Sequence, residues 1–139
     1  MIRNIEDDLQ SYIEQVLVSL YGEKYEFSAS NYEFIELNAE SKERPGDRCG
    51  IIRIGFNHQR RQVFIPNIYL PEDLRYKGTG KKLIYIVYYI SKQFKYDVYV
   101  ADLTDSFRAR LLKRGALETG IYDMLEIVES TVLLSENMG

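Results

Sequence analysis

The chain begins with a stretch whose apolar residues recur at helical spacing. They are Ile5, Leu9, Ile13, Val16, Leu17 and Leu20. Asn4 stands at the expected N-cap position, the acids after it complement the helix dipole, and Gly22 supplies a stop. This pattern predicts one amphipathic helix over residues 5–21, with its apolar side in the core.

From Tyr25 to Tyr69 the pattern changes to alternation, with many aromatic and β-branched residues. The predicted strands cover about residues 34–37, 51–56 and 61–70. Separated by turns, they form a three-stranded antiparallel meander. Pro66 falls within the third strand, where it indicates either a bulge with a lost ladder hydrogen bond or an edge strand.

Beyond the meander, helical and extended patterns alternate. The predicted elements are a helix from about Thr79 to Phe94, a strand at 96–100, a helix from Thr104 or Asp105 to Gly115, and a strand at 124–128. A helix between two strands implies a right-handed parallel crossover, so we expect a mixed sheet. Residues from about 130 to 139 are expected to fray.

Composition is that of a globular protein, and we predict a single domain over residues 1–139. Hydrophobic residues make up 45% of the chain and charged residues 28%. No apolar run has membrane-spanning length and the N-terminus lacks the pattern of a signal peptide, so with a single cysteine, Cys49, we expect a cytoplasmic protein. One cysteine and one histidine also argue against a zinc site, and we assign no metal ligands.

A glycine turn carries the strongest indication of chemistry. Pro71 ends an apolar strand, a turn with Gly78 and Gly80 follows, and a helix begins. Glycines let backbone N–H groups approach a ligand, and a helix start adds unpaired donors and the positive end of the dipole. Residues 41–82 carry a net charge of +6, whereas residues 1–40 carry −7. The turn therefore predicts a site for an anion such as a pyrophosphate.

Two common phosphate motifs do not fit this turn. A Walker A loop needs glycine where the chain has Arg75, and Ser or Thr where it has Lys82. A dinucleotide fingerprint needs a third glycine where the chain has Leu83. What remains, Arg75-x-x-Gly78-x-Gly80 between a strand and an apolar helix, resembles the R/Q-x-x-G-x-G/A signature of the GNAT acetyltransferase superfamily. An ordinary turn with a solvated basic rim is the alternative.

The resemblance, which covers about residues 31 to 128, implies a fold, a coenzyme and a set of contacts. The fold is a GNAT-like α/β (α+β) mixed sheet, an antiparallel meander followed by a parallel crossover at the glycine turn, flanked by helices. The coenzyme is acetyl-CoA or another acyl-CoA, whose pyrophosphate meets the turn and whose pantetheine arm lies where a bulged strand splays from its neighbour. The residues implied to bind it are Ile68, Tyr69, Leu70, Arg75, Lys77, Gly78, Thr79, Gly80 and Lys81.

The second motif of the family is weaker here. Many members have a tyrosine that protonates the departing thiolate, and alignment on Gly115 places Leu111 there. The side chains weighed as general base are Glu33, Glu36, Asp102 and His58, and the hydroxyls weighed as acid are Tyr69, Tyr99 and Tyr122. We choose Glu36 and Tyr122 as the catalytic pair, although a surface charge and amphipathic packing are their ordinary explanations.

The predicted activity is direct acyl transfer from CoA to an amine, making the chain an N-acetyltransferase. A covalent intermediate is not expected, because Cys49 has no histidine beside it in sequence. The acidic N-terminal region favours a cationic acceptor. The alternative is a GNAT-like CoA-binding or regulatory module that has lost catalysis, and a nucleic-acid surface ranks below both. No membrane partner is expected, and the oligomeric state is left open, a dimer included.

Overall fold

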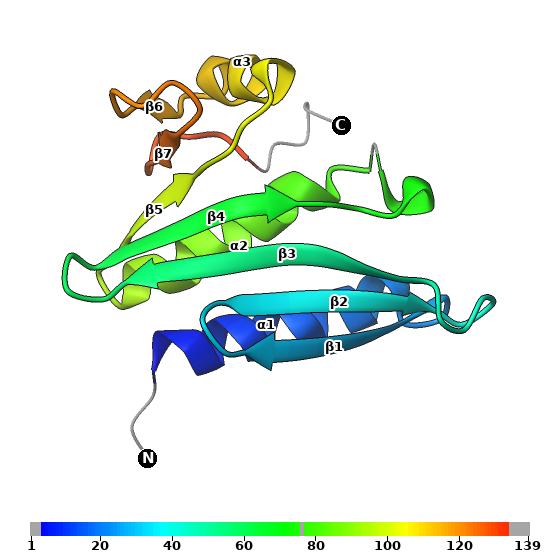
Figure 1. Ribbon diagram of the computed structural model, residues 1–139. Coiled ribbons are helices and arrows are strands. Elements are labelled where there is room, and N and C mark those ends of the chain that lie inside the picture. Colours follow the sequence, from blue (N-terminus) through cyan, green and yellow to red (C-terminus); the bar gives the residue numbers. More distant parts are fainter. Residues whose placement is uncertain (1–3, 76, 134–139) are drawn as a thin grey trace.

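The structure, a computed structural model, describes residues 4–75 and 77–133 as an α+β fold around one seven-stranded mixed sheet (Figure 1). The helices are α1 (Ile5–Tyr21), the 3-10 helix η1 (Glu72–Leu74), α2 (Thr79–Gln93) and α3 (Asp105–Lys113). The strands are β1 (Tyr25–Asn31), β2 (Ile35–Ser41), β3 (Arg48–Asn57), β4 (Gln62–Ile68), β5 (Asp97–Val100), β6 (Leu117–Glu118) and β7 (Leu125–Ile127). In the sheet they lie in the order β1-β2-β3-β4-β5-β7-β6. The predicted mixed sheet flanked by helices is confirmed.

Helix α1 has the predicted bounds and the predicted caps. The side chain of Asn4 accepts a hydrogen bond from the Asp7 N–H at 2.8 Å, and the Gly22 N–H donates to the Val18 carbonyl at 2.8 Å. Its buried residues are Ile5, Leu9, Ile13 and Leu17. Local capping and one apolar stripe are therefore sufficient to define this helix.

The meander has four strands, where we predicted three. Strand β1 pairs antiparallel with β2 from Tyr25 opposite Ser41 to Asn31 opposite Ile35. This strand was not predicted because only its first half carries aromatic residues, whereas the second half consists of residues with short, mostly polar side chains. The family resemblance implies a first strand that in this chain is either missing or reduced to residues 1–3, which lie outside the described residues.

Strand β4 is central in the sheet, so the edge-strand interpretation of Pro66 is wrong. Its antiparallel register with β3 runs from Arg53 opposite Asn67 to Gly55 opposite Phe64, which leaves one extra residue on β4. This is the predicted bulge, and it coincides with the proline that cannot donate a ladder hydrogen bond. On its other side β4 pairs in parallel with β5, which confirms the crossover.

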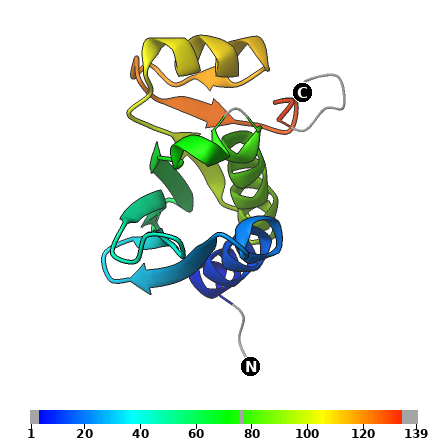
Figure 2. The ribbon, with the colours of Figure 1, turned by 90° about the vertical axis from the view of Figure 1, so that its right-hand side faces the viewer.

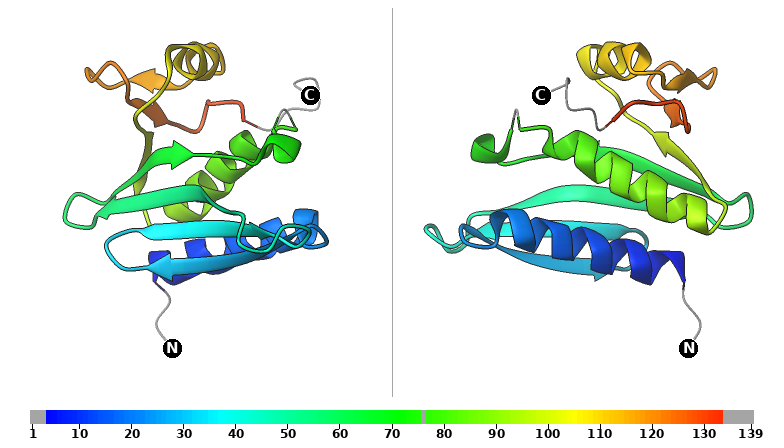
Figure 3. Two further views of the ribbon diagram at one scale, coloured as in Figure 1. Left: turned by 45° about the vertical axis from the view of Figure 1, so that its right-hand side comes forward. Right: turned by 180° about the vertical axis from the view of Figure 1, so that it is seen from behind.

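Helices α1 and α2 lie side by side on one face of β1–β4, and α3 packs beside β7 at the far end of the sheet (Figures 2 and 3). The helix-facing side chains of β2 are Ile35, Leu37, Ala39 and Ser41, all buried. No described helix covers the other face of the meander (Figure 1). That face carries the half-buried polar residues of β2, Glu36 among them.

The chain after β7 is anchored where we expected fraying. The Val132 N–H donates to the Arg114 carbonyl at 2.8 Å, and Leu133 is only 5% exposed. Gly115, with a φ of +102°, lets the chain turn closely beneath this segment. Residues 134–139 of the expected frayed tail lie outside the described residues. Of the helices in the described chain, none combines the length and the apolar character needed to cross a membrane.

Candidate functional site

The glycine turn adopts the conformation that its sequence suggests. Gly78 caps α2 with a φ of +75°, a left-handed conformation that costs other residues about 1–2 kcal/mol. A Cβ on Gly80 would meet only Ile68 Cγ2, at 3.9 Å. Gly78 is therefore needed for backbone conformation, whereas Gly80 leaves the start of α2 open to an incoming group.

Three backbone donors point out of this helix start. The first hydrogen bond of α2 joins the Lys82 N–H to the Gly78 carbonyl at 3.1 Å. The N–H groups of Thr79, Gly80 and Lys81 precede it and find no acceptor in the described part of the chain. Thr79 is 2% exposed and its hydroxyl is hydrogen-bonded to that of Tyr21, which holds the start of α2 against the end of α1.

The cations around the turn come from two parts of the chain. Burial lowers the pKa of Lys81 below the ordinary lysine value of 10.5, and the positive charges of Arg114 and Arg110 lower it further. Two arginines of the α3 region therefore reach the same place as the basic turn. The sequence showed their charge, but it did not show that they lie close enough to Lys81 for their charges to act on it.

Arg75 is held back along the strand. Its Nε donates to the Leu70 carbonyl at 2.8 Å, and its guanidinium lies 5.2 Å from the centre of the Tyr69 ring. Lys77 is exposed. The predicted ligand set is thus brought to one region, with Arg75 turned toward the strand that precedes the turn.

Strands β4 and β5 diverge immediately before the turn (Figure 1). Their parallel pairing ends where the Ala101 N–H donates to the Ile65 carbonyl at 2.9 Å. Tyr69 turns its N–H to the Ile51 carbonyl, at 2.7 Å, on the β3 side. No backbone hydrogen bond of the described chain links residues 68–70 to β5. The end of β4 and the two residues after it therefore have an edge without backbone partners from β5, ahead of the glycine turn.

Glu36 lies in an open groove of about 540 Å³ on the helix-free face. Its Oε2 accepts a hydrogen bond from Arg53 Nε at 2.7 Å, forming a cross-strand ion pair. The remaining lining residues are Asn38, Cys49, Gly50, Ile51, Ile52 and Tyr69. Tyr69 directly follows β4 and lies in the segment that leads to the glycine turn, so this segment connects the groove to the turn.

Cys49 lies on β3. Burial raises the pKa of its thiol above the ordinary 9.0, and the charge of Asp47 adds to this. The charge of Arg75 acts in the opposite direction. The thiol is therefore protonated and poorly nucleophilic at neutral pH.

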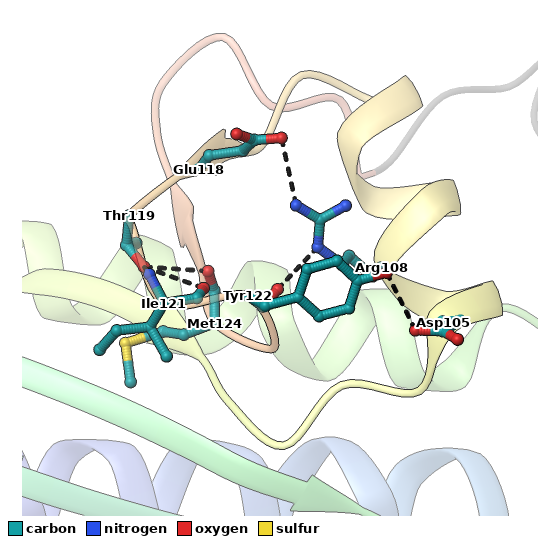
Figure 4. A network of polar contacts seen from close by, with 7 residues as sticks. All are labelled: Asp105, Arg108, Glu118, Thr119, Ile121, Tyr122 and Met124. Carbon is teal, nitrogen blue, oxygen red and sulfur yellow. Dashed lines mark hydrogen bonds and ion pairs between the residues drawn. The ribbon is translucent and has the colours of Figure 1, made fainter.

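Tyr122 lies between β6 and β7, in a polar network beside α3 (Figure 4). Glu36 lies on β2, which β3, β4 and β5 separate from β7 in the sheet. The hydroxyl of Tyr122 donates to Asp105 Oδ1 at 3.1 Å, and the Arg108 guanidinium lies 4.3 Å from its ring centre. Arg108 also donates to the Tyr122 carbonyl at 2.7 Å and to Glu118 at 3.1 Å. The structure thus does not bring together the two residues chosen as a catalytic pair.

The remaining candidates are dispersed. His58 bridges Glu6 Oε1 at 3.0 Å and the Tyr96 hydroxyl at 2.7 Å, and so ties the β3–β4 turn to α1. Tyr99 stacks on Phe64 with ring centres 5.4 Å apart, and Leu111 is fully buried in the core. Glu33 and Asp102 are exposed. Among the residues that the structure describes, no three metal-ligating side chains cluster.

A scan against models of known protein families finds no match for this chain, and a search of curated proteins finds no relative. The function is therefore argued from the turn, the divergent strands and the groove.

Proposed function

We propose that the chain binds an acyl-CoA at the junction of β4 and α2 and has a GNAT-like fold. The observation that carries the proposal is that β4 leaves β5 directly before a turn with three unused N–H donors. A pyrophosphate would accept hydrogen bonds from Thr79, Gly80 and Lys81, at the positive end of the α2 dipole. The strand order, with an antiparallel meander and then a parallel crossover, supports this assignment.

The pantetheine arm would extend along residues 68–70. Its amide groups can exchange hydrogen bonds with the β4 edge that β5 leaves unpaired, as an added strand does. Lys81, with Arg110 and Arg114 close by, would meet phosphate charge; their mutual repulsion, seen in the lowered pKa of Lys81, would be relieved by the anion.

The proposed reaction is direct N-acyl transfer. The amine attacks the thioester carbonyl carbon, a C–N bond forms and the C–S bond breaks, the amine loses a proton and the thiolate gains one. The raised pKa of the Cys49 thiol supports a route without an acyl-cysteine. Glu36, in the groove beside Tyr69, is the proposed base. Tyr122 is not proposed as the acid, because it lies apart from Glu36 and its hydroxyl bonds to Asp105, so the thiolate takes its proton from water.

A second candidate is a GNAT-like module that binds CoA without turnover. It is favoured by the burial of Leu111, at the position where the family resemblance implies a tyrosine acid, and by the engagement of Tyr122 with Asp105. In that case the turn would serve as a CoA sensor or an anchor for a partner protein.

Titration calorimetry with CoA and acetyl-CoA at moderate salt tests the shared part of both candidates. We expect saturable binding to wild type and none to Gly80→Glu. No heat and no thermal shift with either ligand would refute the proposal.

Thiol release over a panel of cationic and neutral amines separates the two candidates. For an enzyme, Glu36→Gln should lower turnover by about 100-fold or more, the scale of general base catalysis, with CoA affinity unchanged. Absence of turnover with every amine, in a chain that binds CoA, would favour the module.

A further inference from the structure

Helices α1 and α2 form a layer on one face of the sheet, and the outer surface of this layer is acidic on α1 and basic on α2. Helix α1 contains acidic residues and no basic ones, whereas α2 contains three lysines and no acids. Asp7 on α1 and Lys82 and Lys92 on α2 are exposed, and Glu14 is half-buried. Since the helices lie side by side on one face of the sheet (Figure 3), an acidic and a basic stripe run next to each other.

Part of this charge is unused within the chain. Lys92 pairs with Asp97 at 2.8 Å, and Asp7 takes part in the cap of α1. Glu14 and Lys82 form no ion pair with any described residue. The layer therefore offers one acid, Glu14 in the middle of α1, and one base, Lys82 in the first turn of α2, and neither contacts a charged side chain of the described residues.

Aromatic side chains project from the basic stripe. Tyr85 and Tyr89 stack with ring centres 6.2 Å apart and remain 38% and 56% exposed. On α1 a shallow, open groove of about 560 Å³ runs between outward side chains of that helix alone, Ser11, Gln15 and the exposed Val18 among them. One helix thus carries projecting rings, and the other carries a shallow groove along its outer surface.

The two helices are antiparallel, and two contacts set their register. Tyr21, the last residue of α1, touches Thr79, the first of α2, and at the other end the His58 ring joins Glu6 to Tyr96. Because both helices rise about 1.5 Å per residue, Tyr89 lies level with Ser11, and Tyr85 lies level with Gln15. The rings on α2 therefore match the groove on α1 in position along the layer.

We propose that two copies of this chain form a dimer through the α1–α2 layer, about a two-fold axis parallel to the helices. This axis places α2 of each copy on α1 of the other, without shifting either along its length. Tyr85 and Tyr89 then enter the partner's α1 groove, where polar groups can accept their hydroxyls. Lys82 comes within reach of the partner's Glu14. The other way to pack the two layers face to face uses a two-fold axis perpendicular to the helices within the plane of the layer. That dimer would place α1 against α1 and α2 against α2, so stripes of like charge would face each other.

The layer is of moderate size for an interface. Helix α1 has 17 residues and is thus about 25 Å long, and packed helices lie about 10 Å apart. A face of this length and two helices wide has a projected area of about 500 Å², below the roughly 800 Å² per partner of a standard interface, so we expect a dimer of modest affinity. The helix-free face and the glycine turn stay accessible, so the dimer does not depend on the proposed coenzyme site.

Sedimentation equilibrium over a concentration series tests the charge pairing. We expect a mass of about twice 16.3 kDa for wild type, and a dissociation constant raised about tenfold or more in Lys82→Glu and in Glu14→Lys. The double variant should regain the dimer. Lys113→Glu, with the same charge change on exposed α3, should dimerise like wild type. Circular dichroism and thermal melting confirm that each variant is folded.

Disulfide trapping tests the geometry and distinguishes it from attraction within one chain. In a Cys49→Ala background, mixing Ser11→Cys with Tyr89→Cys protein should give a cross-linked dimer under mild oxidation. Neither variant alone should, nor Ser11→Cys mixed with Lys113→Cys. A wild-type monomer at hundreds of micromolar would overturn the proposal. So would a dimer that neither the charge variants nor the trapping affects, because it would use another face.

Discussion

The glycine turn and the α3 corner differ in how many of their polar groups have hydrogen-bond partners. The α3 corner is the polar network of Asp105, Arg108, Glu118 and Tyr122 beside α3. At the turn, three N–H groups have no acceptor in the described chain, and burial together with the charges of Arg114 and Arg110 lowers the pKa of Lys81. At the corner, Tyr122 bonds to Asp105, and Arg108 bonds to Glu118 and to a backbone carbonyl (Figure 4). Unused donors and crowded like charges indicate a surface that a ligand completes, whereas a closed network indicates a structural role.

The largest difference between the two regions should come from Gly80→Glu. The new carboxylate would stand in front of the α2 N–H groups, so CoA affinity should fall by about 100-fold or more, or about 2.7 kcal/mol. Gly80→Ala is the matched control, because a Cβ there has only an ordinary 3.9 Å contact. Calorimetry measures both; unchanged affinity in Gly80→Glu would move the anion site away from the turn.

A smaller effect is expected from Gly78→Ala, which forces a left-handed φ of +75° on alanine. The strain of about 1–2 kcal/mol should lower the free energy of unfolding, the CoA affinity or both, with up to about tenfold weaker binding. Gly55→Ala, also in open space but without positive φ, is the matched control. Urea melts and calorimetry report the two effects; equal behaviour of the two variants would contradict the conformational argument.

The pH dependence of CoA binding should show whether Lys81 contacts the ligand. An anion favours the protonated amine, so affinity is complete below the lowered pKa of Lys81 and decreases as pH rises through it. A lysine with the ordinary pKa of 10.5 would lose its charge at higher pH, so the decrease should begin earlier than such a lysine would cause. The affinity should decrease by a few-fold. Lys81→Arg keeps its charge and should flatten the profile. An identical slope in that variant would show that Lys81 does not contact the ligand.

The smallest effect on binding is expected at the corner. Tyr122→Phe removes a hydroxyl whose partner is Asp105, so unfolding free energy should fall by no more than about 1 kcal/mol. CoA affinity should stay within about twofold of wild type in the same calorimetric assay. A large loss of affinity would mean that the α3 corner belongs to the coenzyme site, and the contrast between the regions would disappear.

Local features were predictable where local forces determine them. The bounds of α1 follow from Asn4, an apolar stripe and Gly22, and the glycine turn follows from Pro71 and Gly78. Strand β1 was missed because its short polar residues gain their stability from pairing with β2. The sequence could not show whether Glu36 and Tyr122 lie close together, because no spacing in sequence fixes the distance between a residue on a strand and one in a distant loop.

The sequence by itself determined the three α-helices and the basic glycine turn, because capping, periodicity and backbone restrictions act over a few residues. At Pro66 it left a bulge and an edge strand open, and the pairing with β3 and β5 decided for the bulge. Only the tertiary structure decided that α3 brings Arg110 and Arg114 to Lys81, that β5 leaves β4 before the turn, and that an acidic helix lies beside a basic one. These arrangements depend on how whole elements pack, and packing joins residues that are distant in the chain.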